Sequence, residues 1–196
     1  MKTYLLFLLF LPFLLLLTLS CKQKPEEKEK KFISVLSLIE KQVAHVDTSL
    51  YAITRIVYID SLHSDTGYIR REEFRSVAKE FLDIPDLSEK KIAKKYMEET
   101  RYDELLNRVI ITYKPINGDD GEIKKQEIQV TPNLATGDKV NNIIINRVIN
   151  NRDGFLQKDM LWQIDKSFQV VTTTRQPGQP EKITITKVTW NEDSDQ

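Results

Sequence analysis

Apolar residues recur at helical spacing directly after Lys31. The spacing predicts an amphipathic helix over residues 32–46, whose apolar positions are Leu36, Ile39, Val43 and Val46. The same spacing continues through residue 57, so one long helix that pairs with a copy of itself is the alternative. Residues 47–49 favour a turn, however, and the segment beyond them is rich in β-branched and aromatic side chains. We therefore expect the helix to end at residue 46 and a strand to cover residues 51–60.

Two more helices are expected before the pattern changes. Residues 61–67 have the composition of a loop, and a second helix is predicted over residues 70–82, ending before Pro85. The apolar face of this helix consists of Phe74, Val77, Ala78, Phe81 and Leu82. Ser88 is expected to cap a short basic helix that ends at Tyr96.

Beyond residue 107 the apolar period changes from about 3.6 to 2. Alternating strands are expected, separated by turn-forming segments, at residues 108–114, 123–131, 140–149, 160–164, 168–172 and 183–190. The last strand changes the parity of its apolar residues between Ile185 and Val188, which indicates a β-bulge or a strand with two packing surfaces. The expected fold class is α+β, with two N-terminal helices plus a short third packed on one face of a curved antiparallel sheet of about five to seven strands.

The chain begins with a basic residue, an apolar run and a single cysteine. Lys2 precedes the run from Leu5 to Leu19, which is interrupted by Pro12 and is shorter than the roughly 20 residues that a membrane-spanning helix needs. This arrangement is typical of a secretory signal peptide. Cys21 follows the run and is the one cysteine in the sequence, which excludes an internal disulfide. A plain signal peptide with an incidental cysteine is the alternative.

The segment Leu-Thr-Leu-Ser-Cys, which ends at Cys21, resembles the lipobox of bacterial lipoproteins. The resemblance implies cleavage after residue 20 and a diacylglycerol on the sulfur of Cys21, whose amine can also carry an acyl chain such as palmitate. Two or three acyl chains are enough to hold a soluble domain to a bilayer. Lys22 stands where an aspartate often marks inner-membrane retention in that family, and this favours the outer membrane. The rest of the chain resembles small uncharacterised envelope lipoproteins.

The expected organisation has four parts. Residues 1–20 are the signal peptide, and residues 21–31 are the lipidated cysteine and a charged tether without apolar side chains after the cysteine, which predicts a solvated spacer. Residues 32–191 form a single domain, expected to be a monomer, and residues 192–196 form a disordered tail. The whole chain carries 29 basic and 29 acidic residues, so it has no basic footprint of the kind that nucleic-acid binding requires.

No residue pattern points to catalysis, a cofactor or a metal. Two histidines, His45 and His63, are too few for a zinc site, and motifs for an activated serine or a nucleotide phosphate are missing from the sequence. The densest group of oxygen ligands is interpreted as a hairpin turn rather than a Ca²⁺ site: Asn117, Asp119, Asp120 and Glu122. A basic group is interpreted as a solvated face, with contact to anionic headgroups as the alternative: Lys90, Lys91, Lys94 and Lys95, with Arg70 and Arg71 nearby.

Six aromatic residues are candidates for a ligand-binding or partner-binding surface, with plain core as the alternative: Tyr96, Tyr113, Phe155, Trp162, Phe168 and Trp190. The first functional hypothesis is a non-enzymatic envelope lipoprotein that binds a partner protein or an envelope component. The second is a carrier or sensor of a small apolar ligand held between sheet and helices. A closed apolar cavity would favour the carrier, and a solid core with an exposed apolar patch would favour the binding protein.

Overall fold

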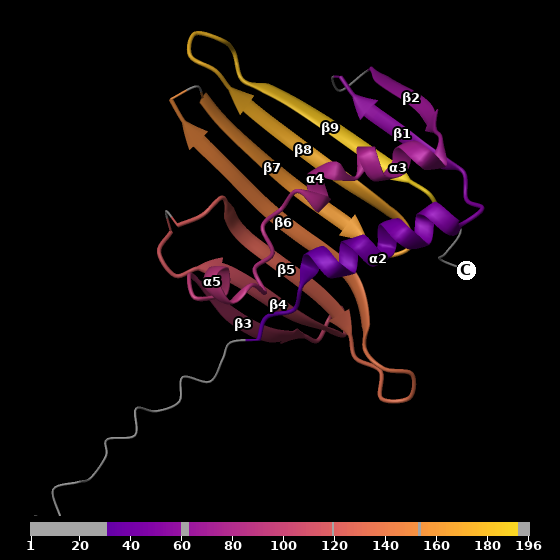
Figure 1. Cartoon of the computed structure of the whole chain (residues 1–196), viewed down its shortest axis with the longest axis vertical. Coiled ribbons are helices and arrows are strands. Elements are labelled where there is room, and N and C mark those ends of the chain that lie inside the picture. Colours follow the sequence, from indigo (N-terminus) through magenta and orange to yellow (C-terminus); the bar gives the residue numbers. More distant parts are fainter. Residues whose placement is uncertain (1–30, 60–62, 119, 153, 192–196) are drawn as a thin grey trace, which may run out of the picture.

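The computed structural model describes residues 31–59, 63–118, 120–152 and 154–191. Within these ranges, nine antiparallel strands form one twisted sheet in the order β2-β1-β9-β8-β7-β6-β5-β4-β3 (Figure 1). The predicted signal peptide, Cys21, the tether before Lys31 and the tail 192–196 lie outside the described residues. No helix in the described ranges is long and apolar enough to cross a membrane.

Seven strands follow one another along the chain as a meander that begins at one edge of the sheet. They are β3 (Tyr96–Asp103), β4 (Arg108–Pro115), β5 (Ile123–Thr131), β6 (Lys139–Asn151), β7 (Gly154–Gln163), β8 (Ser167–Arg175) and β9 (Lys182–Thr189). The hairpin of β1 (Ile53–Tyr58) and β2 (Ser64–Ile69) precedes them in the sequence but pairs with β9 in space. The edges of the sheet are therefore β2 and β3.

Four helices of the described chain bury apolar residues against one face of this sheet (Figure 1). They are α2 (Val35–Thr48), α3 (Arg71–Val77), α4 (Lys79–Leu82) and α5 (Lys90–Ala93). The hydroxyl of Ser34 caps α2 by accepting a hydrogen bond from the Ser37 N–H at 3.1 Å, and it also donates to Asp86 at 2.7 Å. This second bond ties the start of the helix to the segment that leads into α5.

The junction after residue 46 is a helix, a turn and a strand, as the residue types predicted. The helix ends at Thr48, where the Ser49 hydroxyl donates to the carbonyl of Val46 at 2.9 Å, and β1 begins at Ile53. The alternative of one long helix through residue 57 is wrong. The predicted helix over residues 70–82 is divided at Ala78, whose ψ of 0° ends α3, but Phe74, Ala78 and Phe81 are fully buried as expected.

The expected α+β fold class with five to seven strands is wrong, because the nine-stranded sheet dominates the domain and two strands separate the first helix from the second. The strands that the sequence analysis missed are β2 and β3. Both are edge strands, and edge strands carry exposed polar side chains instead of an apolar alternation. The predicted Ser88 cap is also wrong: the Ser88 N–H donates to the Asp86 carboxylate at 2.9 Å, and α5 is a single turn.

The core between helices and sheet is built around five aromatic rings. They are Phe74, Phe81, Trp162, Phe168 and Trp190, and each is at most 2% exposed. The ring centroids of Phe81 and Trp162 are 5.0 Å apart, and those of Trp162 and Phe168 are 5.1 Å apart. Edge-to-face and offset contacts at these distances add to the stability that burial alone supplies.

Candidate interaction surface

The register of the strands separates the residues of the sheet into two faces. Ile143, Trp162, Phe168 and Val188 lie directly opposite one another on successive strands and face the helices. Neighbouring residues along a strand point to opposite sides. Ile144, Leu161, Gln169 and Lys187 therefore lie on the other side, where none of the described helices packs. We call this side the open face.

An apolar stripe crosses the open face from β6 to β1. In this stripe Ile144 is paired with Leu161, Val171 is paired with Ile185, and Ile185 is paired with Tyr58. Ile56 and Ile183 extend the stripe along β1 and β9, so its members are Ile56, Tyr58, Ile144, Leu161, Val171, Ile183 and Ile185. Most of these side chains are half-buried, and Ile183 is 52% exposed. Two polar residues interrupt the stripe, because Gln169 and Lys187 lie between Leu161 of β7 and Ile56 of β1. Apolar residues gathered on a sheet face without a helical cover are typical of an interaction site.

A row of amide and hydroxyl side chains borders the stripe on the side of the β5–β6 hairpin. Its members lie opposite one another on six successive strands: Gln129, Asn142, Gln163, Ser167, Thr189 and Thr54. The Ser167 hydroxyl donates to the Gln163 side chain at 2.8 Å. The apolar stripe therefore has a polar border, as an interface core has a polar rim.

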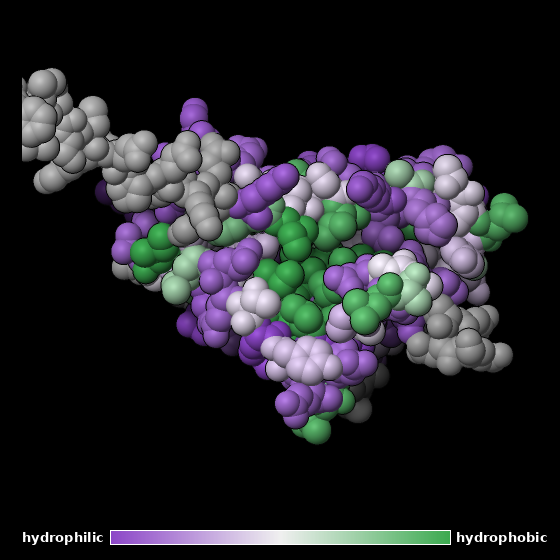
Figure 2. All heavy atoms as spheres, turned by 90° about the horizontal axis from the view of Figure 1, so that it is seen from below, coloured by the Kyte–Doolittle hydropathy of each residue, from purple (hydrophilic) through white to green (hydrophobic). Residues whose placement is uncertain are grey.

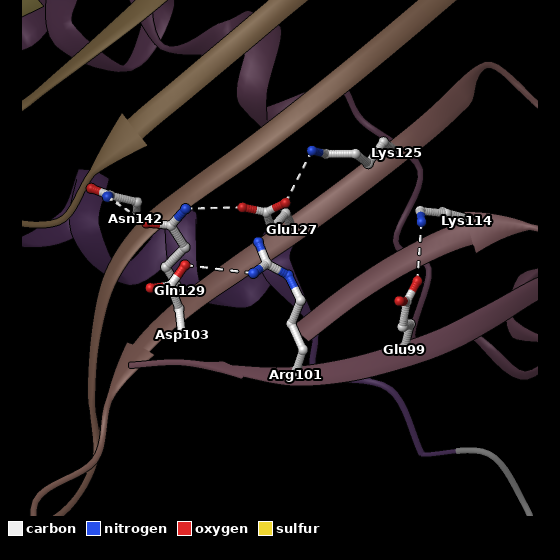
Figure 3. Close-up of polar contacts among 8 residues, drawn as sticks. All are labelled: Glu99, Arg101, Asp103, Lys114, Lys125, Glu127, Gln129 and Asn142. Carbon is white, nitrogen blue, oxygen red and sulfur yellow. Dashed lines mark hydrogen bonds and ion pairs between the residues drawn. The ribbon is translucent and has the colours of Figure 1, made fainter. Parts of the chain in front are cut away.

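A charged lattice covers the part of the open face that is formed by β3, β4 and β5 (Figure 3). Lys114 pairs with Glu99 at 3.0 Å, and Lys125 pairs with Glu127 at 3.0 Å. Gln129 links the lattice to the polar row, since its amide donates to Glu127 at 2.9 Å and accepts from Arg108 at 3.0 Å.

This lattice shields an apolar residue of its own. Ile110 lies opposite Arg101 on one side and Gln129 on the other, and it is 2% exposed although it is not part of the core under the helices. Long polar side chains can cover apolar surface with their stems while their charged ends stay in water. The lattice thus makes this part of the open face polar. The stripe remains the apolar part of the open face.

Glu127 is the most buried acid of the lattice, at 7% exposure. Its burial favours the neutral carboxyl, but hydrogen bonds from Gln129 and Lys125 and the charges of Lys125 and Arg101 outweigh the burial. The pKa of Glu127 therefore lies below its ordinary value, and the carboxylate is ionised at neutral pH.

Two hollows open at the ends of the sheet. One, of about 430 Å³, lies between α2 and the β5–β6 hairpin and is lined by Leu38, Gln42, Val140 and Ile164, among others. Its lining residues Gln42 and Asp165 are joined by two hydrogen bonds: the Gln42 amide donates to the Asp165 carboxylate at 2.9 Å, and the Asp165 N–H donates to the Gln42 side-chain oxygen at 2.8 Å. The second, of about 480 Å³, lies at the opposite end beside Glu122, Lys124 and Val148. The residues that line these two hollows are both polar and apolar, and none belongs to the aromatic core.

Most of the aromatic candidates from the sequence lie in the core and not on a surface. Trp162, Phe168 and Trp190 belong to the central cluster, and Tyr113 stacks on Phe32 with ring centroids 4.4 Å apart. Burial raises the pKa of Tyr113 to about 12. Tyr96 is also buried and donates its hydroxyl hydrogen to the carbonyl of Ile123. Phe155 is the exception, because it lies half-buried on the open face under the Arg175 guanidinium at 5.0 Å.

The titratable candidates are dispersed. His45 and His63 are exposed on separate segments. In the turn before β5, Asn117 donates to Asp120 at 3.1 Å, whereas Glu122 turns away to pair with Arg147 at 2.9 Å; Asp119 lies outside the described residues. The described part of the chain brings no three histidine, cysteine or acidic residues together as a metal site.

The four lysines around α5 are exposed: Lys90, Lys91, Lys94 and Lys95. Of the two arginines grouped with them, Arg70 pairs with Glu73 at 2.7 Å and Arg71 is half-buried.

The sequence analysis did not identify the stripe as a surface, although two signals pointed to it. One signal was that β6 carries apolar residues on both of its faces. The other was that the apolar residues of β9 change from one face of the strand to the other. The structure resolves the second signal: β8 and β9 pair without a register shift, so Ile183 and Ile185 face outward while Val188 faces the core. The strand has two packing surfaces, and the alternative of a β-bulge is wrong.

This arrangement of a nine-stranded sheet, a helical cover and an open face cannot be assigned by likeness, since the chain matches no family model, no curated protein and no solved structure.

Proposed function

We propose that this protein is a lipid-anchored component of a bacterial outer membrane that binds a partner protein through the apolar stripe of its open face. The observation that carries this proposal is the stripe itself, which crosses five strands. At about 4.8 Å between strands it is roughly 19 Å wide. The proposed anchor is supported by the segment ending at Cys21, which resembles a lipobox, and such an anchor would hold the stripe in the envelope.

The packing of the core favours this function over the carrier of an apolar ligand. The space between helices and sheet is filled by aromatic rings about 5–6.5 Å apart, and Phe74, Phe81 and Trp162 have no exposed surface. A ligand that entered this space would have to displace close-packed side chains, which is costly in a protein interior. The two hollows described above lie outside the aromatic core and are open to solvent.

A photocrosslinker at Ile185 of the full-length protein, expressed in its own envelope, tests the proposal. We expect a defined protein adduct that is lost when Leu161→Glu places a charge in the stripe. The matched control is Gln163→Glu, which adds the same charge two residues away on the same strand and face. Circular dichroism of both variants shows whether the fold is kept.

Two results would contradict the proposal. One is an adduct that persists in the Leu161→Glu variant at the wild-type yield. The other is loss of the adduct to the same extent in the Gln163→Glu control, which would assign the effect to charge alone.

A further inference from the structure

Three exposed leucines lie at the tips of two neighbouring hairpins. Leu105 and Leu106, between β3 and β4, are 98% and 54% exposed, and Leu134, between β5 and β6, is fully exposed. Val109 of β4 is paired with Val130 of β5, so both tips leave the sheet at the same end. Isolated exposed leucines are common on protein surfaces, but a group at adjacent tips calls for a specific contact.

The turns hold these leucines in place. In the first tip the Leu106 N–H donates to Asp103 at 3.1 Å, and the Tyr102 hydroxyl donates to Asn107. In the second tip the Asn133 side chain accepts hydrogen bonds from the N–H groups of Ala135 and Thr136 at 2.9 and 3.0 Å. The exposure of the leucines is therefore a feature of ordered turns.

The charge around the tips is nearly balanced. Asp103, Glu104 and Arg108 border the first tip, and Asp138 and Lys139 border the second. The Asp138 carboxylate accepts a hydrogen bond from the Asn133 N–H at 3.2 Å. A surface that meets these tips therefore interacts with them through apolar contact and not through charge.

The length of the chain before residue 32 places a bilayer within reach of the tips. Phe32 is held on β4 by its stacking on Tyr113, and Leu106 lies seven residues from Tyr113, or about 23 Å at about 3.3 Å per residue. The ten residues between Cys21 and Phe32 span at most about 33–36 Å. A lipid on Cys21 can therefore lie in the same bilayer that the tips touch.

We infer that the tips of the β3–β4 and β5–β6 hairpins dock into the surface of the bilayer that holds the anchor, with Leu105, Leu106 and Leu134 inserted among the headgroups. This inference rests on the proposed anchor. Such docking fixes the orientation of the domain. The end of the sheet from which the β5–β6 hairpin projects faces the lipid (Figure 1). Figure 2 shows this end, where apolar residues gather in a hollow. The Leu134 hairpin also contributes Val140 to the lining of the hollow beside α2, so that hollow lies at the same end of the domain.

Depth-dependent quenching of a fluorescent label tests the inference. The full-length protein is purified with its lipid and reconstituted in phosphatidylcholine vesicles that contain nitroxide-labelled lipid. Because the lipid blocks the sulfur of Cys21, Leu134→Cys supplies the one reactive thiol. The control is Ile116→Cys, at a position that is 52% exposed and lies just beyond the opposite end of β4. We expect quenching at position 134 to exceed quenching at position 116 several-fold.

A second variant separates insertion from mere proximity. Leu105→Lys with Leu106→Lys should lower the quenching at position 134 to the level at position 116, because two charged side chains oppose insertion of the neighbouring tip. These positions are exposed, so the melting temperature should not change.

Three outcomes would overturn the inference. Equal quenching at positions 134 and 116 in a protein whose intact mass includes the acyl chains would do so and leave the anchor standing. A protein adduct at position 134 in the native envelope, together with equal quenching, would assign the tips to a protein partner. An intact mass without acyl chains would instead remove the anchor, and with it the basis of the docking geometry.

Discussion

At the scale of single residues, the aromatic rings decide whether the helices stay on the sheet. Phe81 lies on the single turn of α4, has no exposed surface and contacts both Trp162 and Phe168, with ring centroids 5.0 and 5.3 Å apart. Since α4 has only four residues, it cannot be stable by itself. Its position therefore depends on this ring.

We expect Phe81→Ala to lower the free energy of unfolding by about 3–5 kcal/mol, as is typical when a buried phenylalanine is truncated. This is a large fraction of the about 5–15 kcal/mol that stabilises a typical domain. Urea denaturation of the variant measures the loss. Tyr68→Ala is the control, because Tyr68 is 86% exposed on β2 and its truncation should change the stability by at most about 0.5 kcal/mol. Equal losses in the two variants would contradict the placement of Phe81.

The ionisation of Glu127 gives the charged lattice a dependence on pH. Its pKa in the folded protein is lower than the ordinary value of 4.5, so the ionised carboxylate stabilises the fold above pH 4.5. This contribution is lost as the pH falls through the lowered pKa. We expect the stability of Glu127→Gln to fall less steeply than that of the wild type as the pH is lowered below 4.5, as measured by urea denaturation over a pH series. Identical acid dependence of the two proteins would contradict this role.

At the scale of elements, two glycines in strands have opposite surroundings. Gly154 begins β7 with φ of +145°, and a Cβ atom there would lie 2.6 Å from the Arg175 carbonyl oxygen of β8. Gly67 lies in the edge strand β2, where a Cβ atom would have no neighbour within 4 Å. Only the first glycine is required by its geometry.

We expect Gly154→Ala to destabilise the protein by more than about 1 kcal/mol, because the new side chain is strained and collides with backbone. Gly67→Ala should leave the stability unchanged or raise it by about 0.4–1 kcal/mol, because it restricts the unfolded chain. Thermal denaturation of the two variants provides the comparison. An undiminished stability of Gly154→Ala would contradict the close approach of Gly154 to the Arg175 carbonyl.

At the scale of the whole molecule, both edges of the sheet are protected against pairing with another copy. The β3 edge carries Glu98, Glu99 and Arg101, and β2 is only six residues long and contains Asp65. Short and charged edge strands oppose edge-to-edge association. The edges of the sheet therefore favour a domain that does not pair edge to edge with a second copy.

We therefore expect the protein to be monomeric in detergent micelles. Sedimentation equilibrium measures its mass after correction for bound detergent. A stable dimer would contradict this expectation, and hydrogen exchange across β2 would then show whether the two sheets join at that edge.

The sequence by itself determined the elements whose side chains alternate between two environments. Strands β4, β5, β6, β8 and β9 and the first helix were predicted close to their observed positions, because one side of each is mainly buried and the other is more exposed. Only the second half of β7 was predicted, since the strand begins at Gly154 and the prediction began at residue 160. The same logic identified the buried face of α3 and α4. The strand after residue 50 was also predicted correctly, since β-branched residues outweighed the helical spacing.

The tertiary structure alone decided the features that depend on distant neighbours. β2 and β3 became strands because β1 and β4 offer them backbone hydrogen-bond partners, and the polar side chains of these edge strands carry no periodic signal for this. The pairing of β1 with β9 likewise joins segments more than 120 residues apart. It completes the apolar stripe by bringing Tyr58 beside Ile185. The stripe and the two leucine tips are surfaces assembled from separate strands, and a surface of this kind exists only once the register of every intervening strand is set.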